Sequence, residues 1–397
     1  MSENEPANNG LFVGARRADL YREAEEDLVP IEADDSLTGE PAPSPEPQGE
    51  LPEDVIAPVP AALESPVPME PGSGPVTTVG VPAVAETLPA QWGWRARVRK
   101  STAGLVRLAP DEAELADRRA ITTIRQATWT RSVNVLVTNP KGGTGKTPTA
   151  LILAGILGQV RGGYVVAWEA AESLGSLTRR AEGDPVRGLA ELLGGVQRIR
   201  SAGNLGGYTA PQTSHADVIG SIEEREVLTA ADVVAVRQIL DTYYRMTVTD
   251  TGNNPGHEAY RAALRTADAA VLPCLVSIDA LAGVEEALKV IRAAGQDWTD
   301  LASRVVIVLG HDGGPEDSDI AAALRQRLSE LGVAAVVEVP FDPAIRLGGE
   351  ITLSALSTAS MRAWTAVAAA VVTSLRTAPT SIDLVQRLKA ATSRRTA

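Results

Sequence analysis

Residues 132–152, SVNVLVTNPKGGTGKTPTALI, constrain the fold more than any other stretch of the chain. An apolar, β-branched run over 133–137 leads into a turn at Asn139 and Pro140, and a glycine-rich loop follows. The chain then continues as a run of alanine and leucine that is typical of a helix. This order of strand, glycine loop and helix is the pattern of a phosphate-binding loop.

The residue types in this loop suit a polyphosphate ligand. Gly142, Gly143 and Gly145 let successive backbone N–H groups face one anion, and the following helix adds its positive end. Lys146 supplies a charge for the β- and γ-phosphates, and the Thr147 hydroxyl is placed to bind Mg²⁺. We therefore expect a nucleotide to be bound by Gly142, Gly143, Thr144, Gly145, Lys146, Thr147 and Pro148.

Two positions depart from the ordinary P-loop pattern. Pro140 stands where that pattern has its first glycine, and a second lysine, Lys141, follows it directly. The run KGGTGKT therefore resembles the deviant P-loop of the MinD/ParA ATPases. The resemblance implies a Mg-ATP site and an ATP-dependent homodimer, in which Lys141 reaches across the interface to the nucleotide of the partner subunit.

A second strand is predicted in GGYVVAWEA, and its spacing from the loop indicates a βαβ unit with a parallel sheet. In the MinD/ParA family this strand runs into an Asp-x-Asp or Asp-x-Asn motif that helps to position Mg²⁺ and the attacking water. The corresponding positions here are Glu169 and Ala171, with Glu172 adjacent. Because Ala171 lacks the second carboxylate, hydrolysis is in doubt rather than binding, and Glu169 and Glu172 are the candidates that could compensate.

An acidic residue at the end of a later strand completes the expected phosphate site. The strand MTVTD ends at Asp250, which places its carboxylate at the carboxyl edge of the sheet. There it can hold Mg²⁺ together with Thr147, while the N–H of Gly252 contacts the γ-phosphate. An aspartate that only caps a turn is the alternative. The downstream run TADAAVLPC, as in the same family, favours a Walker B aspartate.

Helical and strand patterns alternate to the end of the domain, which predicts a doubly wound, mostly parallel α/β sheet over residues 130–378. In the MinD/ParA family an Asn, often followed by Arg, ends the VVIVL-type strand and contacts the base, whereas this chain has Gly310 and His311. The segment PFDPAIRLGGE resembles the second base-contacting loop of the family. Its candidate residues are Pro340, Phe341 and Asp342.

Acidic residues and prolines are concentrated in residues 1–90. This stretch holds 18 acidic and 3 basic side chains of a chain with net charge -13, so the remainder is close to neutral. Such a composition cannot bury enough apolar surface to offset its chain entropy, and it predicts a disordered acidic arm. A run at 11–28 has helical spacing, so an unidentified protein partner could bind there; a transient helix without a role is the other interpretation.

The segment 91–129 begins with QWGWRARVRK, where two tryptophans meet four cations without an acid. This cluster suits an anionic lipid surface or a nucleic-acid backbone. Alternatively, the tryptophans dock onto the ATPase body and the cations stay solvated. A similar Gly-Trp-Arg segment precedes the domain in actinobacterial MinD/ParA-like proteins, including accessory ATPases of type VII secretion. A connecting helix is predicted over 111–129.

The remaining features concern compartment and surfaces. The single cysteine, Cys274, cannot form an internal disulfide, no apolar run reaches the ~18 residues of a membrane span, and the acidic N-terminus does not resemble a signal peptide. We therefore expect a cytoplasmic protein. Residues 379–397 are predicted to form a helix and a basic tail, and this helix is too short and too weakly amphipathic to favour membrane binding. Non-specific DNA binding stays open, because a near-neutral body neither requires nor excludes a basic surface on a dimer.

The sequence thus predicts a slow MinD/ParA-like ATPase whose ATP-bound dimer is a switch for intracellular positioning, plasmid partition or recruitment of a secretion partner. Water would attack the γ-phosphate in line, with the charge neutralised by Lys146, Mg²⁺ and Lys141 of the partner subunit. The alternative is a nucleotide-binding scaffold or regulator with little or no hydrolysis that recruits partners through its arm. The alanine at 171 favours that alternative.

Overall fold

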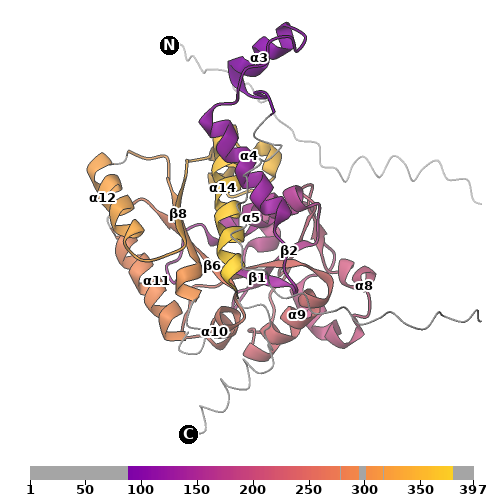
Figure 1. The fold of residues 1–397 in the computed structure, drawn as a ribbon. Helices are drawn as coiled ribbons and strands as arrows, with labels where there is room; N and C mark the ends of the chain where they lie inside the picture. Colours follow the sequence, from indigo (N-terminus) through magenta and orange to yellow (C-terminus); the bar gives the residue numbers. More distant parts are fainter. Residues whose placement is uncertain (1–87, 278, 295–300, 316, 379–397) are drawn as a thin grey trace, which may run out of the picture. The chain divides into compact units, whose positions relative to one another are not determined.

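Eight strands form one sheet in the order β3-β4-β2-β5-β1-β6-β7-β8. The computed structural model describes residues 88–277, 279–294, 301–315 and 317–378. The predicted arm, apart from its last three residues, and the predicted helix over 379–397 lie outside the described residues. Figure 1 shows the sheet with helices on both of its faces.

The strands are β1 (Val133–Val137), β2 (Val165–Ala170), β3 (Ala210–Pro211), β4 (Ala216–Ile219), β5 (Met246–Thr251), β6 (Ala269–Leu275), β7 (Val305–Gly310) and β8 (Ala335–Val339). The longer helices are α3 (Gly93–Ser101), α4 (Glu112–Gln126), α5 (Lys146–Arg161), α7 (Leu189–Gly195), α8 (Ala202–Gly206), α9 (Ala230–Tyr243), α10 (Glu258–Arg265), α11 (Ala280–Ala294), α12 (Ser318–Ser329) and α14 (Thr358–Ser374). Single turns are formed by α6 (Leu177–Arg180) and α13 (Pro343–Arg346).

Every pair of neighbouring strands is parallel except β3 with β4. The predicted doubly wound, mostly parallel sheet is therefore confirmed. The edge strand β3 and its neighbour β4 lie in a polar, glycine-rich stretch that the sequence indicates only as a connection. Asp217 interrupts the apolar pattern of β4, and the structure explains it, because its carboxylate accepts a hydrogen bond from the Tyr244 hydroxyl at 2.7 Å.

Alternate residues of the central strands face two separate cores. In β1, Val133, Val135 and Val137 pack with α5 and α14, whereas Leu136 belongs to the opposite core with α9, α10 and α11. All five β1 residues are buried, as expected for a central parallel strand covered on both faces. The two cores fix β1, and therefore the loop that follows it, in the middle of the sheet.

The helix after the glycine loop lies unusually close to the sheet. A Cβ at Gly158 would stand 2.8 Å from the backbone nitrogen of Ala216, just where β4 begins. Only glycine allows α5 to approach β4 this closely. This contact fixes α5, and the glycine loop lies at the opposite, N-terminal end of the same helix.

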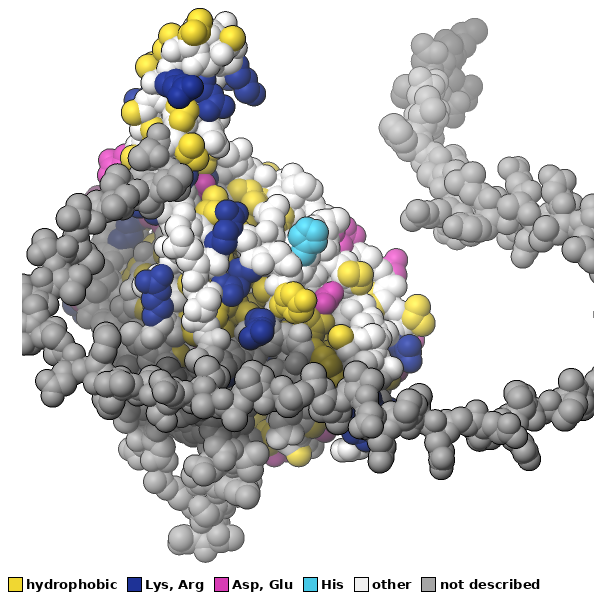
Figure 2. Space-filling model, turned by 45° about the vertical axis from the view of Figure 1, so that its right-hand side comes forward, with side chains coloured by type: hydrophobic (Ala, Val, Ile, Leu, Met, Phe, Trp, Pro, Cys, Tyr) yellow, Lys and Arg dark blue, Asp and Glu magenta, His cyan; other side chains and the backbone are white. Residues whose placement is uncertain are grey.

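Within residues 88–129, the two tryptophans have different surroundings. The Cζ of Arg362 on α14 lies 4.0 Å from the centroid of the Trp92 ring, whereas Trp94 on α3 is 63% exposed. The docking predicted for the tryptophans thus occurs for Trp92 alone. Figure 2 shows Lys and Arg side chains among hydrophobic ones on the projecting α3 region, and exposed Leu105 adds to this surface. The connecting helix, α4, ends at Gln126, three residues earlier than predicted.

The last residues of the predicted arm also contact the segment that follows, through Leu108 and helix α4. Ala90 is buried, its N–H donates to the Leu108 carbonyl at 2.8 Å, and the Arg118 guanidinium donates to the carbonyls of Leu88 and Pro89. An N-terminal truncation that keeps these contacts must therefore end at residue 87 or earlier.

We predict that deletion of residues 1–87 leaves the melting temperature and ATP affinity unchanged, because the composition of that stretch cannot support a core. Deletion of residues 1–92 is the matched control and should lower the melting temperature, since it also removes Ala90 and Trp92. Calorimetry on both truncations tests this. A large loss of stability in the shorter deletion would contradict the prediction.

Candidate nucleotide-binding site

The glycine loop is anchored at its start by a buried side chain. Asn139 donates from Nδ2 to the Pro273 carbonyl at 2.9 Å and accepts at Oδ1 from the Lys141 N–H at 2.9 Å. Gly143 and Gly145 then adopt left-handed φ values of 74° and 90°. Helix α5 begins without a side-chain cap, so its first N–H groups are available to an anion.

Lys146 lies over this loop. Its Nζ donates to the carbonyls of Asn139 at 3.0 Å and Lys141 at 3.1 Å. Burial lowers the pKa of the Lys146 ammonium group, and the nearby charges of Asp250 and Glu172 oppose that shift. The only ligands of the ammonium among the described residues are thus neutral carbonyls, which a phosphate could replace.

The structure brings Thr147 and Asp250 together, although they are far apart in the sequence. The Thr147 hydroxyl donates to Asp250 Oδ2 at 2.7 Å, while Asp250 Oδ1 is buried with no hydrogen-bond partner in the described part of the chain. Burial raises the pKa of the Asp250 carboxyl to about 7. A hydroxyl beside a carboxylate with an orphaned oxygen fits Mg²⁺, which prefers oxygen ligands and keeps several waters.

The two candidate glutamates have different surroundings. Glu169 Oε1 accepts hydrogen bonds from the Gly175 N–H at 3.1 Å, from the Ser221 hydroxyl and from the Arg225 guanidinium at 3.3 Å. Its side chain is 1% exposed, and three donors bind Oε1, while Oε2 is buried with no hydrogen-bond partner in the described part of the chain. These contacts anchor one oxygen, and the catalytic role of Glu169 stays a prediction.

Glu172 faces the phosphate loop instead. Its carboxylate rests against Gly252, where any Cβ would overlap Oε2, and Oε2 is buried with no hydrogen-bond partner in the described structure. It is also one of the two charges that act on Lys146. The structure thus places a carboxylate near Lys146 and Gly252, although Ala171 supplies none.

Lys141 points to a different neighbour from that of Lys146. Its Nζ forms an ion pair with Asp279, next to the start of α11, and its side chain is 48% exposed. A cavity of about 180 Å³ lies beside Lys141, between the glycine loop and α11.

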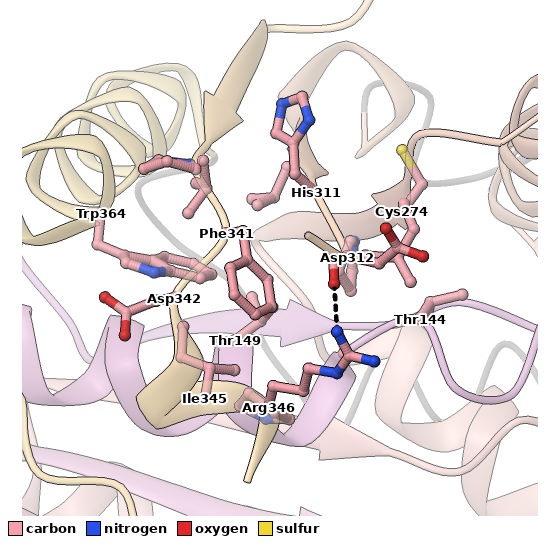
Figure 3. A pocket seen from close by; sticks show the side chains of 18 of the residues that line it. Thr144, Thr149, Cys274, His311, Asp312, Phe341, Asp342, Ile345, Arg346 and Trp364 are labelled. Atoms are coloured by element: carbon pink, nitrogen blue, oxygen red, sulfur yellow. Dashed lines mark hydrogen bonds between the residues drawn. The ribbon is translucent and has the colours of Figure 1, made fainter. Parts of the chain in front are cut away.

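A cavity of about 320 Å³ lies beside the loop at the carboxyl ends of β6, β7 and β8. Figure 3 shows Phe341 and Trp364 as its aromatic walls, with Arg346 donating to the Asp312 carbonyl at 3.0 Å. Concave sites with apolar walls and a few polar groups suit small ligands. A flat heterocycle attached to a phosphate in the loop would fit this arrangement.

The loop after β8, which is predicted to contact the base, reaches this cavity. Pro340, Phe341 and Asp342 line it, but the Asp342 carboxylate already accepts the N–H groups of Ala344 at 3.0 Å and Ser357 at 2.8 Å. Asp342 therefore caps the backbone, and Pro340 and Phe341 remain the better candidates for contact with a base.

On the other loop, Gly310 and His311 line the same cavity. His311 Nε2 lies 2.6 Å from Glu338 Oε1, and Arg325 binds the same carboxylate at 2.7 and 2.8 Å. This loop therefore offers no amide side chain to read a base.

Sequence reasoning missed Asn139 and Arg225 as parts of the site. Asn139 lay in the motif itself, as the polar residue that ends a buried run, and could have been chosen on that ground. Arg225 is more than fifty residues from Ala171 and Ser173, whose carbonyls it binds, and no local pattern marks it.

No protein-family model matches the chain. The ESX-1 secretion-associated protein EspI of Mycobacterium tuberculosis is 27% identical over 270 residues, which are 67% of this chain and 40% of the length of EspI. EspI is a distant homologue.

Solved structures with a similar fold include a ParA family ATPase from Chlorobium tepidum, which is 19% identical over 59% of this chain and 98% of its own, with a TM-score of 0.47. The cell division ATPase MinD of Pyrococcus furiosus is 20% identical over 60% of this chain and 98% of its own, also with a TM-score of 0.47. A McdA–ATP complex from Cyanothece is 16% identical over 64% of this chain and 99% of its own, with a TM-score of 0.44. ParA and MinD ATPases are thus among the solved structures that the chain resembles.

Within the described ranges, none of the helices combines the length and apolarity that crossing a membrane requires.

The buried Asp250 carboxyl predicts a pH dependence for the nucleotide-free protein. Its pKa is raised from the ordinary 3.8 to about 7, so the unfolded chain loses the proton first as the pH rises. The carboxyl therefore lowers the free energy of unfolding progressively between about pH 4 and about pH 7, and the effect is complete above that range.

Asp250→Asn should remove this slope and raise the melting temperature by several degrees at about pH 8, since ~1 kcal/mol shifts the Tm of a domain of this size by about 2–4 °C. The difference from wild type should shrink towards about pH 4. Thermal scans across this range, with exposed Asp184→Asn as the control, measure it. A difference that does not depend on pH would show that Asp250 is ionised throughout.

Proposed function

We propose that the chain is a MinD/ParA-type ATPase that binds Mg-ATP in a deviant P-loop. The contact between Thr147 and Asp250 carries this proposal, because it joins the hydroxyl and the carboxylate of a magnesium site directly beside a loop built for phosphates. The likeness to ParA and MinD structures is consistent with it. Thr147 and Asp250 would hold Mg²⁺, which supplies charge neutralisation for the β- and γ-phosphates.

The nucleotide would occupy the two neighbouring spaces of the site. Its phosphates would lie against Gly142, Gly143 and Gly145, with Lys146 moving from the loop carbonyls to phosphate oxygens. Its base would enter the cavity beside Phe341.

Lys146→Ala should weaken binding of ATP by about 10- to 100-fold or more, since it removes charge-assisted hydrogen bonds worth about 1.5–3 kcal/mol each. Lys289→Ala on α11 is the matched control, because that lysine is 78% exposed, and it should bind like wild type. Equilibrium titration with a fluorescent ATP analogue and Mg²⁺ measures both variants. Equal affinity of Lys146→Ala and wild type would exclude the loop as the phosphate site.

Dimerisation around the nucleotide is the second part of the proposal. Lys141 is exposed and contacts Asp279 rather than the loop carbonyls that bind Lys146, which is consistent with action in trans. The ion pair is solvent-exposed, and such pairs contribute about 0–1 kcal/mol. Release of Lys141 from Asp279 is therefore inexpensive.

We predict that Lys141→Ala keeps monomer binding of ATP but loses the ATP-dependent dimer. Asp279→Ala, which frees the lysine, should keep the dimer or increase its fraction. Light scattering with ATP and with ADP on the two variants tests the pair of outcomes. A dimer fraction of Lys141→Ala equal to that of wild type would defeat the action in trans.

The ATP state is proposed to control recruitment of a protein partner at a secretion system. Similarity to the secretion-associated EspI supports this, although the matched segment spans only 40% of that relative. The exposed Trp94 and the cations of α3 offer a surface for such a partner, and the acidic arm remains a predicted one. Plasmid partition and non-specific DNA binding stay predictions, as does the expectation that the chain does not bind membranes.

Hydrolysis is proposed to depend on Glu172, whose carboxylate would order the attacking water. The alternative, a nucleotide-dependent scaffold with little turnover, is favoured by Ala171 alone. The orphaned Oε2 of Glu172 beside Gly252 supports the ATPase instead.

A further inference from the structure

One buried arginine binds the backbone of the turn that carries Glu172. Arg225 lies in the loop between β4 and α9, and its side chain is 2% exposed. Its Nη2 donates to the carbonyls of Ala171 at 2.7 Å and Ser173 at 3.1 Å, and its Nη1 donates to that of Glu172 at 3.2 Å. Three consecutive carbonyls are thus held by a single guanidinium.

The guanidinium is itself fixed from behind. Arg225 Nε donates to the Ser221 hydroxyl at 2.7 Å, that hydroxyl donates to Glu169 Oε1, and Nη2 lies 3.3 Å from the same oxygen. The charge of Arg225 is therefore paired with Glu169, which is buried at the end of β2. Because the guanidinium is planar and rigid, its contacts fix the backbone of residues 171–173 relative to Glu169 at the end of β2.

This turn has no regular secondary structure, so its own backbone does not fix the Glu172 carboxylate. Besides Arg225, the Leu228 N–H donates to one of these three carbonyls, that of Glu172, at 3.1 Å. Leu228 belongs to the same loop as Arg225. That loop therefore determines where the Glu172 carboxylate lies relative to Gly252.

We propose that Arg225 is a positioning residue for ATP hydrolysis, which acts by holding the 171–173 turn so that Glu172 faces the phosphate site. The inference rests on the proposed function. In the reaction, the water oxygen bonds to the γ-phosphorus while the bond from phosphorus to the β–γ bridging oxygen breaks. ADP leaves with that oxygen, and the water proton passes through the Glu172 carboxylate to phosphate or solvent.

The arrangement accounts for the alanine at 171. A glutamate one residue later approaches from a different part of the backbone, and a catalytic group misplaced by about 1 Å can cost about 10²-fold in rate. Arg225 supplies the backbone frame that this displaced carboxylate needs.

Single-turnover hydrolysis and equilibrium ATP binding should be measured on Glu172→Gln, Arg225→Lys and the double variant. We expect Glu172→Gln to slow hydrolysis by about 10²-fold and Arg225→Lys by about 10-fold, with ATP affinity within about 2-fold of wild type for both. The double variant should be no slower than Glu172→Gln, because Arg225 acts through Glu172.

Arg237→Lys is the matched control. Arg237 on α9 has the same 2% exposure and a carboxylate partner, Asp241, but it binds Thr247 near the other end of β5. Its variant should lose stability while keeping the single-turnover rate. If Arg225→Lys does not fold, Ser221→Ala removes the contact to Nε and the hydrogen bond to Glu169 Oε1 but leaves the three carbonyl contacts of Arg225. It should show a smaller loss of rate with the same dependence on Glu172.

The outcomes separate this inference from the proposed function. A wild-type rate in Arg225→Lys, or losses that multiply in the double variant, would overturn the positioning role while ATP hydrolysis stands. A wild type that binds ATP without turnover would overturn the positioning role and the hydrolysis, but not the binding site. Loss of ATP binding by Arg225→Lys would show a structural role instead.

Discussion

The hydrogen bond between Thr147 and Asp250 is the interaction on which the site depends. It exists because β1 and β5 are parallel neighbours in a register that pairs Val137 with Asp250. The glycine loop leaves β1 at that point, so the first turn of α5 meets the end of β5. The adjacent strand β2 pairs Glu169 with the same aspartate. Parallel pairing therefore gathers the loop, a hydroxyl and carboxylates at one edge without any contact that is local in sequence.

This gathering brings buried acidic groups close together, which is electrostatically unfavourable. Asp250, Glu169 and Glu172 each carry a buried oxygen without a hydrogen-bond partner in the described structure. Burial, more than any other cause, raises the pKa of Asp250, and the charge of Glu169 adds to that shift. A dication and the N–H-rich loop would satisfy these groups. Nucleotide and metal are thus expected to stabilise the fold as they bind, since a ligand that binds only the native state raises the free energy of unfolding.

The sequence predicted the parts of the site that depend on local chemistry. The glycine loop, Lys146 and Thr147 follow from backbone geometry over a few residues, and Asp250 follows from its place at the end of a strand. The alternation of helical and strand patterns predicted the strands of the sheet except β3 and β4. Strand β3 is only two residues long, and β4 contains Asp217. Trp92 and Trp94 are two residues apart, yet one is held by Arg362 and the other is exposed. Such differences depend on which helix passes nearby, and no local pattern contains that information.

The separate roles of Glu169 and Glu172 follow from the geometry of a strand. Side chains of β2 alternate, so Glu169 shares its face with Val165 and Ala167, on the side of the core that contains α5. The pleat thereby fixes Glu169 among its three donors. Glu172 lies beyond Ala170, the last residue of β2, where the pleat no longer dictates direction. Its carboxylate can face Gly252 only if something other than the strand orients the turn.

The contacts of Arg225 with three successive carbonyls meet that requirement, and the carboxylate that anchors Arg225 is Glu169 itself. The two glutamates are therefore linked: one fixes the guanidinium, and the guanidinium fixes the turn that presents the other.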